Sequence, residues 1–595
     1  MSIFRKKAFS VFVVLIVLTS LVLAACDDDE GDGDDYDLRI VAGSENKTLE
    51  GIIDRWARDK EVSVQVEYLG SLDIMLDLQD GETEYDVVWP ANSIWLDLGD
   101  QQGVVKQVES IWRSPVVLGV KRSIAERLGW AVNDPTTGWT AQPVTMQQIL
   151  TAAEDGEFTL MMTSSTQSNS GASAYFAFLQ AFAGTGQTLT AADLENDQLR
   201  TDIQRFLRSV DRSSGSSGWL MDYCVEQDTY CQAMINYETM IIEANQTLTE
   251  PLFAIYPTDG VAIADSPMGY VDKDDDDTRE LFEDLQQYLL SAPIQTEIEG
   301  FGRRTQPGMR VANPQAGDFN SEWGIDVEAS FSSITFPTAS VIRQALVLYQ
   351  TDFRKGSFTI YCLDYSGSMD EPIEGLDDVT GADQLKDAMD VLLRQNLAAE
   401  YFLQASPNDI TVVLLFTGDI RNYPTVSGAG TRQPVFMSWA MADANSEWTV
   451  VTPVGDTPQA RAQAQANALN SLAIRIRNTD PGGDTNIFLP VYAALQIFNE
   501  FETNGFGEIG PVDMDEYFPA IILMTDGDTN EEAPFQYEQL ASAYPSESGI
   551  PVYGILFGNA EEGDMNRVAQ LTDGRVFDGT EDLVGAFRSA KGYNN

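Results

Sequence analysis

Residues 359–370, with the sequence TIYCLDYSGSMD, run from an apolar segment into one aspartate and two serines. The mostly apolar run at 358–363 is typical of a parallel strand that is buried on both faces. Ligands bind outside the carboxyl ends of such strands in open α/β sheets. We therefore expect Asp364, Ser366 and Ser368 to lie at a ligand-binding edge of a parallel sheet.

Two further segments bring oxygen-bearing side chains to the same predicted edge. Thr485 lies in the glycine-rich stretch GGDTN ahead of a predicted helix, and Asp526 follows the apolar run at 520–524. Hydroxyl and carboxylate oxygens are the ligands that Mg²⁺ and Ca²⁺ prefer. The alternative is a serine-rich turn that caps a helix, beside an unrelated aspartate.

The motif Asp-x-Ser-x-Ser, followed by the threonine and the second aspartate, resembles the metal-ion-dependent adhesion site (MIDAS) of von Willebrand factor type A (VWA) domains. The resemblance covers residues 357–595 and implies a doubly wound, Rossmann-like α/β domain. It implies that a divalent cation, Mg²⁺ first and Mn²⁺ or Ca²⁺ as alternatives, is bound by Asp364, Ser366, Ser368, Thr485 and Asp526. It also implies a partner protein that offers an acidic side chain to the metal.

Residues 38–310 alternate short β-rich runs with helical patterns, which indicates an α/β architecture. The segments AGSENKTL, VVWPANSIWL, TSSTQSNSGASAYFAFL and AMINYETMIIEAN resemble the type 2 periplasmic solute-binding proteins, in which two α/β lobes close over a ligand. The resemblance implies that six polar side chains face this cleft: Ser44, Asn92, Ser165, Thr166, Ser168 and Tyr237. Capping of helices and loops explains such residues without a ligand, and both interpretations remain open from the sequence.

Residues 311–356 separate the two predicted domains. An apolar stripe through Val341, Ala345 and Leu348 predicts a helix in this segment. We therefore expect a structured connector that fixes the orientation of the two domains.

The first 26 residues have the pattern of an export signal. Three basic residues precede a long apolar run that ends in the tetrad LAAC at Cys26. The tetrad resembles the lipobox of bacterial lipoproteins, which implies acylation of Cys26 and a lipid anchor in the cell membrane, facing the extracytoplasmic side. An ordinary signal peptide with an incidental cysteine is the alternative. Residues 27–37 are predicted to be an acidic tether.

Three cysteines remain beyond Cys26. Cys362 lies within the apolar run that precedes Asp364, whereas Cys224 and Cys231 are close together in the sequence. In an exported protein this pair can form a disulfide that closes a short loop. Two reduced thiols are the alternative.

The composition excludes several classes of function. The 595 residues include 92 acidic and 36 basic side chains, a net charge of -56 that repels nucleic acid. The chain contains no histidine, which removes the Ser-His-Asp and Cys-His nucleophile arrangements. An enzyme that uses the metal to activate water is the third alternative. It is disfavoured because no general base beyond the metal's own carboxylates is evident and no P-loop is present. We therefore expect no catalytic residues and no enzymatic activity.

These patterns predict a membrane-anchored extracytoplasmic binding protein. In the main interpretation, the MIDAS docks a partner protein, and the solute-binding-like module is a second recognition element. In the alternative, the protein is a solute-binding lipoprotein for transport or sensing, and its VWA domain recruits a partner.

Overall fold

The computed structural model describes residues 36–592, except for 80, 82, 137, 315–318, 329–330, 374–378, 419–434, 438–440, 443–447, 450–457, 506–510, 528, 531–532, 534, 545–549, 558–562 and 581. The predicted signal peptide, Cys26 and nearly all of the predicted tether lie outside these residues. Within the described part of the chain, no helix has both the length and the apolar character needed to cross a membrane.

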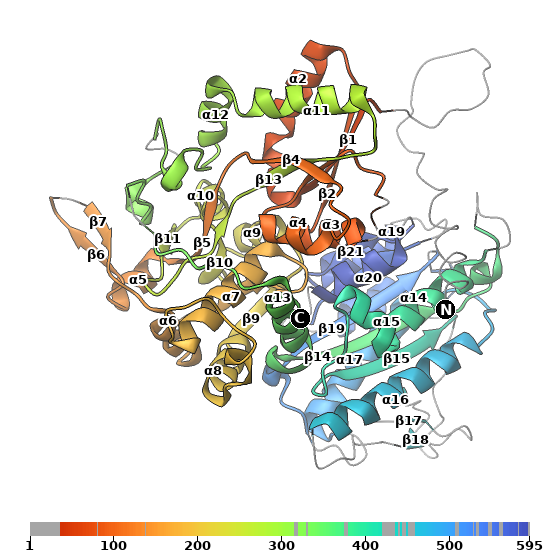
Figure 1. Cartoon of the computed structure of the whole chain (residues 1–595). Coiled ribbons are helices and arrows are strands. Elements are labelled where there is room, and N and C mark those ends of the chain that lie inside the picture. Colours follow the sequence, from red (N-terminus) through yellow and green to blue (C-terminus); the bar gives the residue numbers. More distant parts are fainter. Residues whose placement is uncertain are drawn as a thin grey trace.

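The first lobe is built on a five-stranded sheet with the order β2-β1-β3-β13-β4 (Figure 1). Strands β2, β1 and β3 are parallel, while β13 runs antiparallel to both β3 and β4. The strands are β1 (Leu38–Gly43), β2 (Val64–Leu69), β3 (Val87–Trp89), β4 (Val105–Ser110) and β13 (Pro267–Val271). The helices are η1 (Ser44–Leu49), α2 (Glu50–Lys60), α3 (Ser71–Gln79), α4 (Ser93–Gly99), α11 (Asp276–Leu289) and α12 (Ala292–Glu299).

The second lobe has a sheet with the order β11-β5-β10-β8-β9, and β12 pairs with β5. Its strands are β5 (Ser114–Lys121), β8 (Leu160–Thr163), β9 (Val210–Ser214), β10 (Ala233–Tyr237), β11 (Leu252–Ile255) and β12 (Ile263–Ala264), beside a hairpin of β6 (Ala131–Asp134) and β7 (Gly138–Ala141). Its helices are α5 (Arg122–Arg127), α6 (Met146–Glu154), α7 (Asn169–Ala183), η2 (Asp193–Glu195), α8 (Asp197–Arg208), α9 (Ser217–Glu226) and α10 (Glu238–Asn245). A disulfide joins Cys224 at the end of α9 to Cys231.

The chain crosses between the lobes at β4 to β5, at β12 to β13, and again after α12. At the last crossing, Arg304 forms a two-pronged ion pair with Glu238 at the start of α10, with both N···O distances at 2.8 Å. Both side chains are fully buried. Removing one partner of such a pair leaves a buried charge without compensation, so this pair holds the crossing in place. Two short helical turns follow, η3 (Pro307–Met309) and η4 (Ser321–Trp323).

The C-terminal domain has a sheet with the order β16-β15-β14-β19-β20-β21, parallel except for β16. All nine residues of the central strand β14 are buried, as expected for the apolar run described above. The strands are β14 (Gly356–Asp364), β15 (Ile410–Phe416), β16 (Val435–Met437), β19 (Tyr517–Thr525), β20 (Val552–Leu556) and β21 (Arg575–Asp578), with β17 (Met441–Ala442) and β18 (Trp448–Thr449) forming a separate pair.

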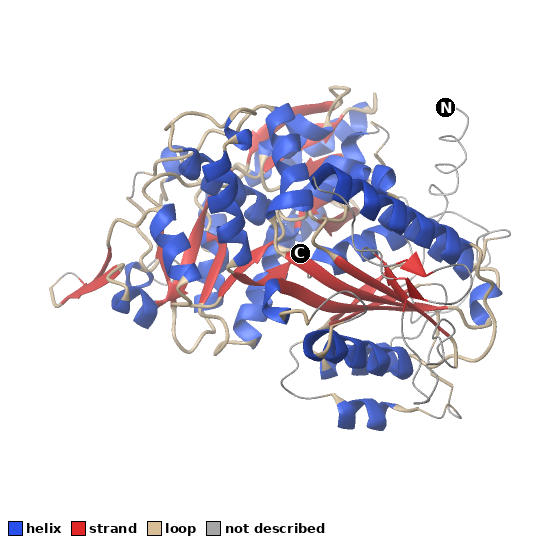
Figure 2. Cartoon of the chain, turned by 90° about the horizontal axis from the view of Figure 1, so that it is seen from below, coloured by secondary structure: helices blue, strands red, loops and turns tan. Residues whose placement is uncertain are grey.

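Helices cover both faces of this sheet (Figure 2). One face packs against α14, α16 and α20, and the other against α17, α18 and α19. The helices are η6 (Ser368–Asp370), α14 (Gly381–Leu393), α15 (Gln395–Ala398), η7 (Ala399–Tyr401), α16 (Pro458–Arg477), α17 (Phe488–Thr503), η8 (Met514–Glu516), α18 (Tyr537–Ala543), α19 (Gly563–Leu571) and α20 (Leu583–Gly592). This two-sided covering is that of a doubly wound α/β fold.

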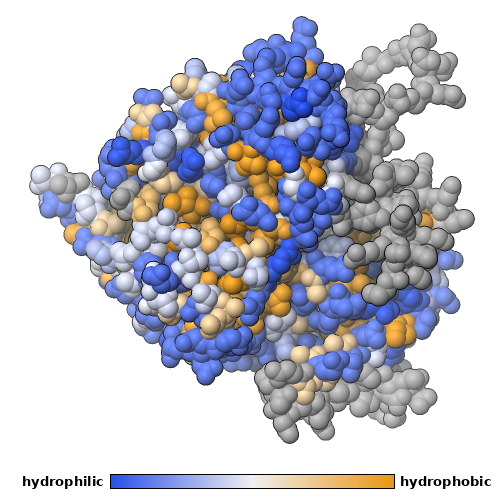
Figure 3. All heavy atoms as spheres, viewed as in Figure 1, coloured by the Kyte–Doolittle hydropathy of each residue, from blue (hydrophilic) through white to orange (hydrophobic). Residues whose placement is uncertain are grey.

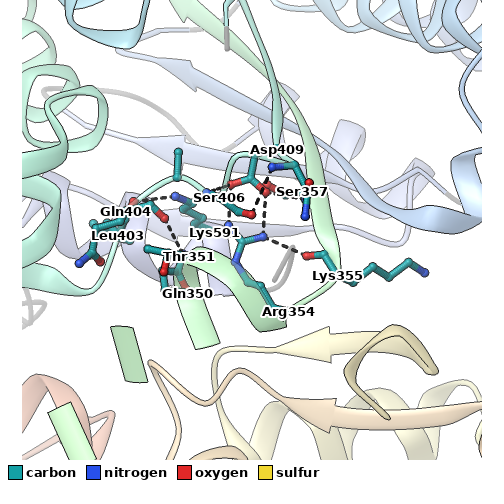
Figure 4. Close-up of polar contacts among 12 residues, drawn as sticks. Gln350, Thr351, Arg354, Lys355, Ser357, Leu403, Gln404, Ser406, Asp409 and Lys591 are labelled. Carbon is teal, nitrogen blue, oxygen red and sulfur yellow. Dashed lines mark hydrogen bonds and ion pairs between the residues drawn. The ribbon is translucent and has the colours of Figure 1, made fainter. Parts of the chain in front are cut away.

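The connector contains α13 (Ala339–Leu348) and the π-helical turn η5 (Tyr349–Phe353). Just after it, Arg354 points toward Asp409 in Figure 4 and donates two hydrogen bonds to its carboxylate, at 2.9 and 2.6 Å. Lys591 of α20 lies beside this pair and donates to the carbonyl of Leu403 at 2.9 Å. These buried charges hold the connector to the C-terminal domain, because each is paired or hydrogen-bonded.

Candidate functional site

The two lobes meet through polar side chains that follow strand ends and helix starts. Ser44, directly after β1, has its Oγ atom 3.0 Å from Oγ of Ser216 in the second lobe. Trp95 of α4 donates from Nε1 to Oδ1 of Asn169, the first residue of α7, at 2.8 Å. Each contact joins one lobe to the other, so the structure has the lobes closed on each other.

A network of hydroxyl and amide groups continues from these contacts into the second lobe. Oγ of Ser217 lies 3.0 Å from Oγ of Ser168 and 2.9 Å from that of Ser170, at the amino-terminal end of α7. Asn169 Nδ2 donates to the Tyr237 hydroxyl at 2.9 Å. We call the following set the inter-lobe polar cluster: Ser44, Glu45, Ser168, Asn169, Ser170, Ser216, Ser217 and Tyr237.

Glu45 is the one carboxylate of the inter-lobe polar cluster. Its side chain is buried, and its Oε1 atom has no hydrogen-bond partner among the described residues. Burial raises the pKa of Glu45 to about 7, although its own backbone N–H and the charge of Arg303 both lower it. The buried Arg303 guanidinium lies 5.0 Å from the centre of the Trp112 ring and donates to Thr48 Oγ1 at 2.8 Å. The cluster therefore combines hydroxyl groups with a carboxyl group that readily gains or loses a proton near neutral pH.

Three of the six residues predicted to bind a ligand, Ser44, Ser168 and Tyr237, lie in this cluster. Asn92 instead caps α4: its Oδ1 accepts from the backbone of Ile94 at 3.0 Å, and its Nδ2 donates to Ile263 at 2.8 Å. This is the capping alternative that the sequence left open.

Ser165 and Thr166 donate to residues outside the cluster. Ser165 donates to the carbonyl of Gly171 at 3.2 Å, and Thr166 donates to Oε1 of Gln350 in the connector at 3.2 Å. The other five members of the cluster were not predicted: Glu45, Asn169, Ser170, Ser216 and Ser217. Two features of the sequence could have indicated them: their position next to predicted residues such as Ser44 and Ser168, and the serine-glycine run SSGSSG at 213–218.

A second group of polar side chains lies at the carboxyl ends of β14 and β19. The buried Asp364 accepts from the backbone N–H of Ser366 at 2.7 Å and from the hydroxyl of Thr525 at 2.6 Å. Oγ of Ser366 lies 3.0 Å from that of Ser368, which donates to Asp526 at 2.8 Å. Four of the five predicted metal ligands are therefore linked in one hydrogen-bonded chain.

Thr485, the fifth, is on a glycine-rich loop that packs against the same edge. The loop contacts the serine turn through Gly483, whose carbonyl accepts from Gly367 at 2.9 Å. The backbone N–H of Asn530, on the segment after Asp526, donates to the Thr485 carbonyl at 3.0 Å. Gly483 has a φ of 105°, which favours glycine at this position. The loop thus brings Thr485 to the two strand ends.

The electrostatics and the donor types of this edge fit a hard cation. Burial raises the pKa of Asp364 to about 7, with the nearby Asp526 charge adding to the rise. Burial also raises the pKa of Asp526. A divalent cation stabilises ionised carboxylates at such a site, and oxygen is its preferred ligand. The described residues contain no group of three or more His, Cys, Asp or Glu side chains that could hold a metal. The set at this edge is of another kind, with three hydroxyls and two carboxylates.

Residues 38–304 match the family model of the bacterial extracellular solute-binding protein. This part of the chain is therefore a solute-binding-protein domain, and the family to which it corresponds acts outside the cytoplasm. No curated protein sequence matches the chain.

The chain is also similar to solved structures. One is the periplasmic binding protein AfuA from Actinobacillus pleuropneumoniae, with 11% identity and a TM-score of 0.38 over 51% of this chain and 93% of that chain. Another is the ferric binding protein from Campylobacter jejuni, with 13% identity and a TM-score of 0.37 over 52% and 98% of the two chains. A third is the periplasmic molybdate-binding protein from Azotobacter vinelandii, with 13% identity and a TM-score of 0.31 over 47% and 100%.

Proposed function

We propose that this chain is an extracytoplasmic solute-binding protein for transport or sensing, and that its two lobes enclose a small, oxygen-rich solute. The observation that carries the proposal is the inter-lobe polar cluster, which lies between the lobes of a solute-binding-protein domain. Opening the lobes would separate Ser44 from Ser216 and Trp95 from Asn169. The hydroxyl and amide groups freed in this way would then form hydrogen bonds to a solute instead of to one another.

The chemistry of the cluster favours a hydroxylated or oxyanionic solute. The fifteen-residue helix α7 begins at Asn169, and the amino-terminal end of a helix attracts oxygen ligands that carry negative charge. Hydroxyl groups of Ser168, Ser217 and Tyr237 both donate and accept hydrogen bonds. The positive charge of Arg303 lowers the pKa of Glu45. The same charge would offset the repulsion between ionised Glu45 and an anionic solute.

Binding of named probes to the purified chain tests this function. Phosphate, sulfate and molybdate represent oxyanions, and glucose and maltose represent neutral hydroxylated solutes, each titrated calorimetrically. We expect one class to bind and Tyr237→Phe to weaken that binding, because the substitution removes only a hydroxyl. Tyr270→Phe is the matched control, since the Tyr270 hydroxyl donates to the Asp275 carbonyl in the first lobe. Equal binding by both variants and the unaltered chain would show that the solute does not bind at the inter-lobe polar cluster.

Ionic strength separates the two classes of solute. The chain has a net charge of -56, and hydrophilic residues cover much of the upper and lower parts of the face in Figure 3. Such a field slows the approach of an anion and is screened by salt. Association of an oxyanion should therefore become faster with added salt, whereas association of a neutral sugar should not.

We infer a second function for the C-terminal domain, which is cation-dependent docking of a partner protein. The hydrogen-bonded chain from Asp364 to Asp526 favours it, as does the resemblance of this motif to the MIDAS of VWA domains. Ser366, Ser368 and Thr485 would hold Mg²⁺, Mn²⁺ or Ca²⁺, with the two aspartates acting through water. A bound cation would offer a position for an acidic side chain of the partner.

Titration of these three ions into the chain tests the second function. We expect saturable binding that the double variant Asp364→Ala, Ser366→Ala loses. Asp484→Asn is the control, because Asp484 precedes Thr485 but is exposed. Binding that the double variant retains would place the ion elsewhere and leave the solute-binding function intact.

The lipid anchor at Cys26 is a further part of the proposal. Acylation would hold the protein in the cell membrane on the extracytoplasmic side. Cys26→Ser should release the protein from the membrane fraction and prevent incorporation of labelled palmitate. Membrane retention by this variant would favour an anchor of another kind. Both proposed functions are those of a binding protein and not of an enzyme, in agreement with the absence of histidine.

A further inference from the structure

The last helix of the chain contacts both lobes of the solute-binding domain. Arg588 of α20 is buried, with 4% of its surface exposed. Its guanidinium forms an ion pair with Asp73 of α3 in the first lobe. The same guanidinium donates to the carbonyl of Thr166 in the second lobe at 2.9 Å. One side chain of the C-terminal domain therefore joins two lobes that must separate for a solute to enter.

The contact at Arg588 is reciprocal. Gln167, next to Thr166 and ahead of α7, donates from its side chain to the backbone carbonyl of Arg588. Gln167 is itself buried. The loop 164–168, which leads into the inter-lobe polar cluster, is thus held by α20 through the carbonyl of Thr166 and the side chain of Gln167.

The connector makes a parallel set of contacts. Arg343 of α13 donates to the carbonyl of Leu98 in the first lobe at 2.9 Å. The Tyr175 hydroxyl of the second lobe donates to the carbonyl of Ala345, also in α13, at 2.8 Å. Because α3 and α4 both belong to the first lobe, the connector and α20 hold the same lobe against the second one at two places.

We propose that the C-terminal domain restrains the opening of the solute-binding lobes, with Arg588 as the residue that connects α3 to the loop 164–168. This regulation rests on the proposed solute-binding function, because it concerns access to the inter-lobe polar cluster. Charge-assisted hydrogen bonds from a buried guanidinium are stronger than neutral ones and depend on geometry. Opening of the lobes must break them, or α20 must leave the interface first. Binding of a partner that moves α20 would then permit solute exchange.

Hydrogen exchange of the full chain, followed by mass spectrometry without any solute, tests the restraint. In Arg588→Gln we read the amides of α3, which lie in the first lobe. In Asp73→Asn we read the amides of 163–170, which lie in the second lobe and do not contain the substitution. Loss of one charge-assisted interaction should make exchange about tenfold faster in each of these segments. Arg575→Gln is the control. The Arg575 guanidinium lies 3.9 Å from the centre of the Trp219 ring in the second lobe. This variant therefore weakens the contact between the C-terminal domain and the second lobe without changing a contact to α3.

Each outcome decides the proposal. Faster exchange in both segments, with α3 unchanged in Arg575→Gln, supports it. Exchange at the unaltered rate in either segment overturns it, as does an equal acceleration over the whole chain, which would mean that Arg588 supports the fold in general. If Arg588→Gln does not fold, the partly exposed Asp73 still gives the decisive reading. No solute is present, so a failed search for a solute leaves this test unaffected.

Discussion

Replacing Glu45 by glutamine should make the solute-binding domain more stable above pH 7 and leave it unchanged below pH 4.5. Burial raises the pKa of this carboxyl to about 7 in the folded protein, against the usual 4.5. Below 4.5 the carboxyl is protonated in both states. As the pH rises from 4.5 through 7, the unfolded chain releases its proton more readily than the folded one, so the unaltered protein loses stability.

The magnitude follows from the two pKa values. A difference of one in pKa between the folded and the unfolded state corresponds to about 1.36 kcal/mol. Ionised Glu45 therefore lowers the free energy of unfolding by about 3 kcal/mol at pH 8. Glutamine has nearly the same shape and no charge, and therefore avoids this cost. For a domain of this size, the melting temperature of Glu45→Gln should exceed that of the unaltered chain by roughly 5 °C at pH 8.

Calorimetric melting between pH 4 and pH 8 measures the effect, with the exposed Glu126 changed to glutamine as the control. The difference between Glu45→Gln and the unaltered chain should grow with pH and then level off above pH 7. A difference that is constant with pH, or a loss of stability at pH 8, would refute the reasoning that Glu45 is buried without sufficient compensation.

Three further predictions concern stability. Arg304→Met should destabilise the solute-binding domain by about 3–5 kcal/mol, since it leaves the Glu238 charge buried and unpaired; an unchanged melting temperature would contradict this. Replacing both Cys224 and Cys231 by serine should cost about 2 kcal/mol by freeing a loop of sequence separation 7, measured in urea with the unaltered chain under reductant for comparison. Burial lowers the pKa of Lys591 to about 8 from the usual 10.5, so the folded chain binds fewer protons and gains stability between pH 8 and 10.5. Lys591→Met should abolish that gain in stability. If the stability of this variant still increased by the same amount between pH 8 and 10.5, the gain would come from other titratable groups.

Local patterns predicted the elements that carry the candidate sites. The apolar run before Asp364 identified β14, because a strand buried on both faces needs apolar residues in succession. The convergence of Asp364 and Asp526 follows from the parallel pairing of β14 and β19, whose carboxyl ends lie at the same edge of the sheet. The helical pattern of residues 383–402 by itself predicts one long helix, but in the structure α14 ends at Leu393 and Arg394 is extended, with φ at -89° and ψ at 105°. After the break, Gln395 accepts from the backbone of Ala405 at 2.8 Å, a tertiary contact that the helical pattern does not contain.

The contacts between parts of the chain could not be predicted in this way. Arg588 and Asp73 are 515 residues apart, and neither is part of a pattern that indicates a partner. The burial of Glu45 also depends on the second lobe, since an isolated turn after β1 would leave its carboxyl in water. Hydrophobic periodicity describes each element by itself, whereas these side chains acquire their environment only when three units pack together.

A disulfide across the lobes tests the central claim most directly. Oγ of Ser44 lies 3.0 Å from Oγ of Ser216, so the double variant Ser44→Cys, Ser216→Cys should form a disulfide that keeps the lobes closed. The five probes are titrated into this variant before and after reduction, with the unaltered chain treated in the same way to account for Cys224 and Cys231. The account predicts that the oxidised variant binds none of the probes and that reduction restores binding, at a level below that of the unaltered chain because two hydroxyl groups of the cluster are replaced by thiols. Equal binding by the oxidised and reduced forms, or no binding of any probe by either form, would contradict the claim that an oxygen-rich solute is held between the lobes.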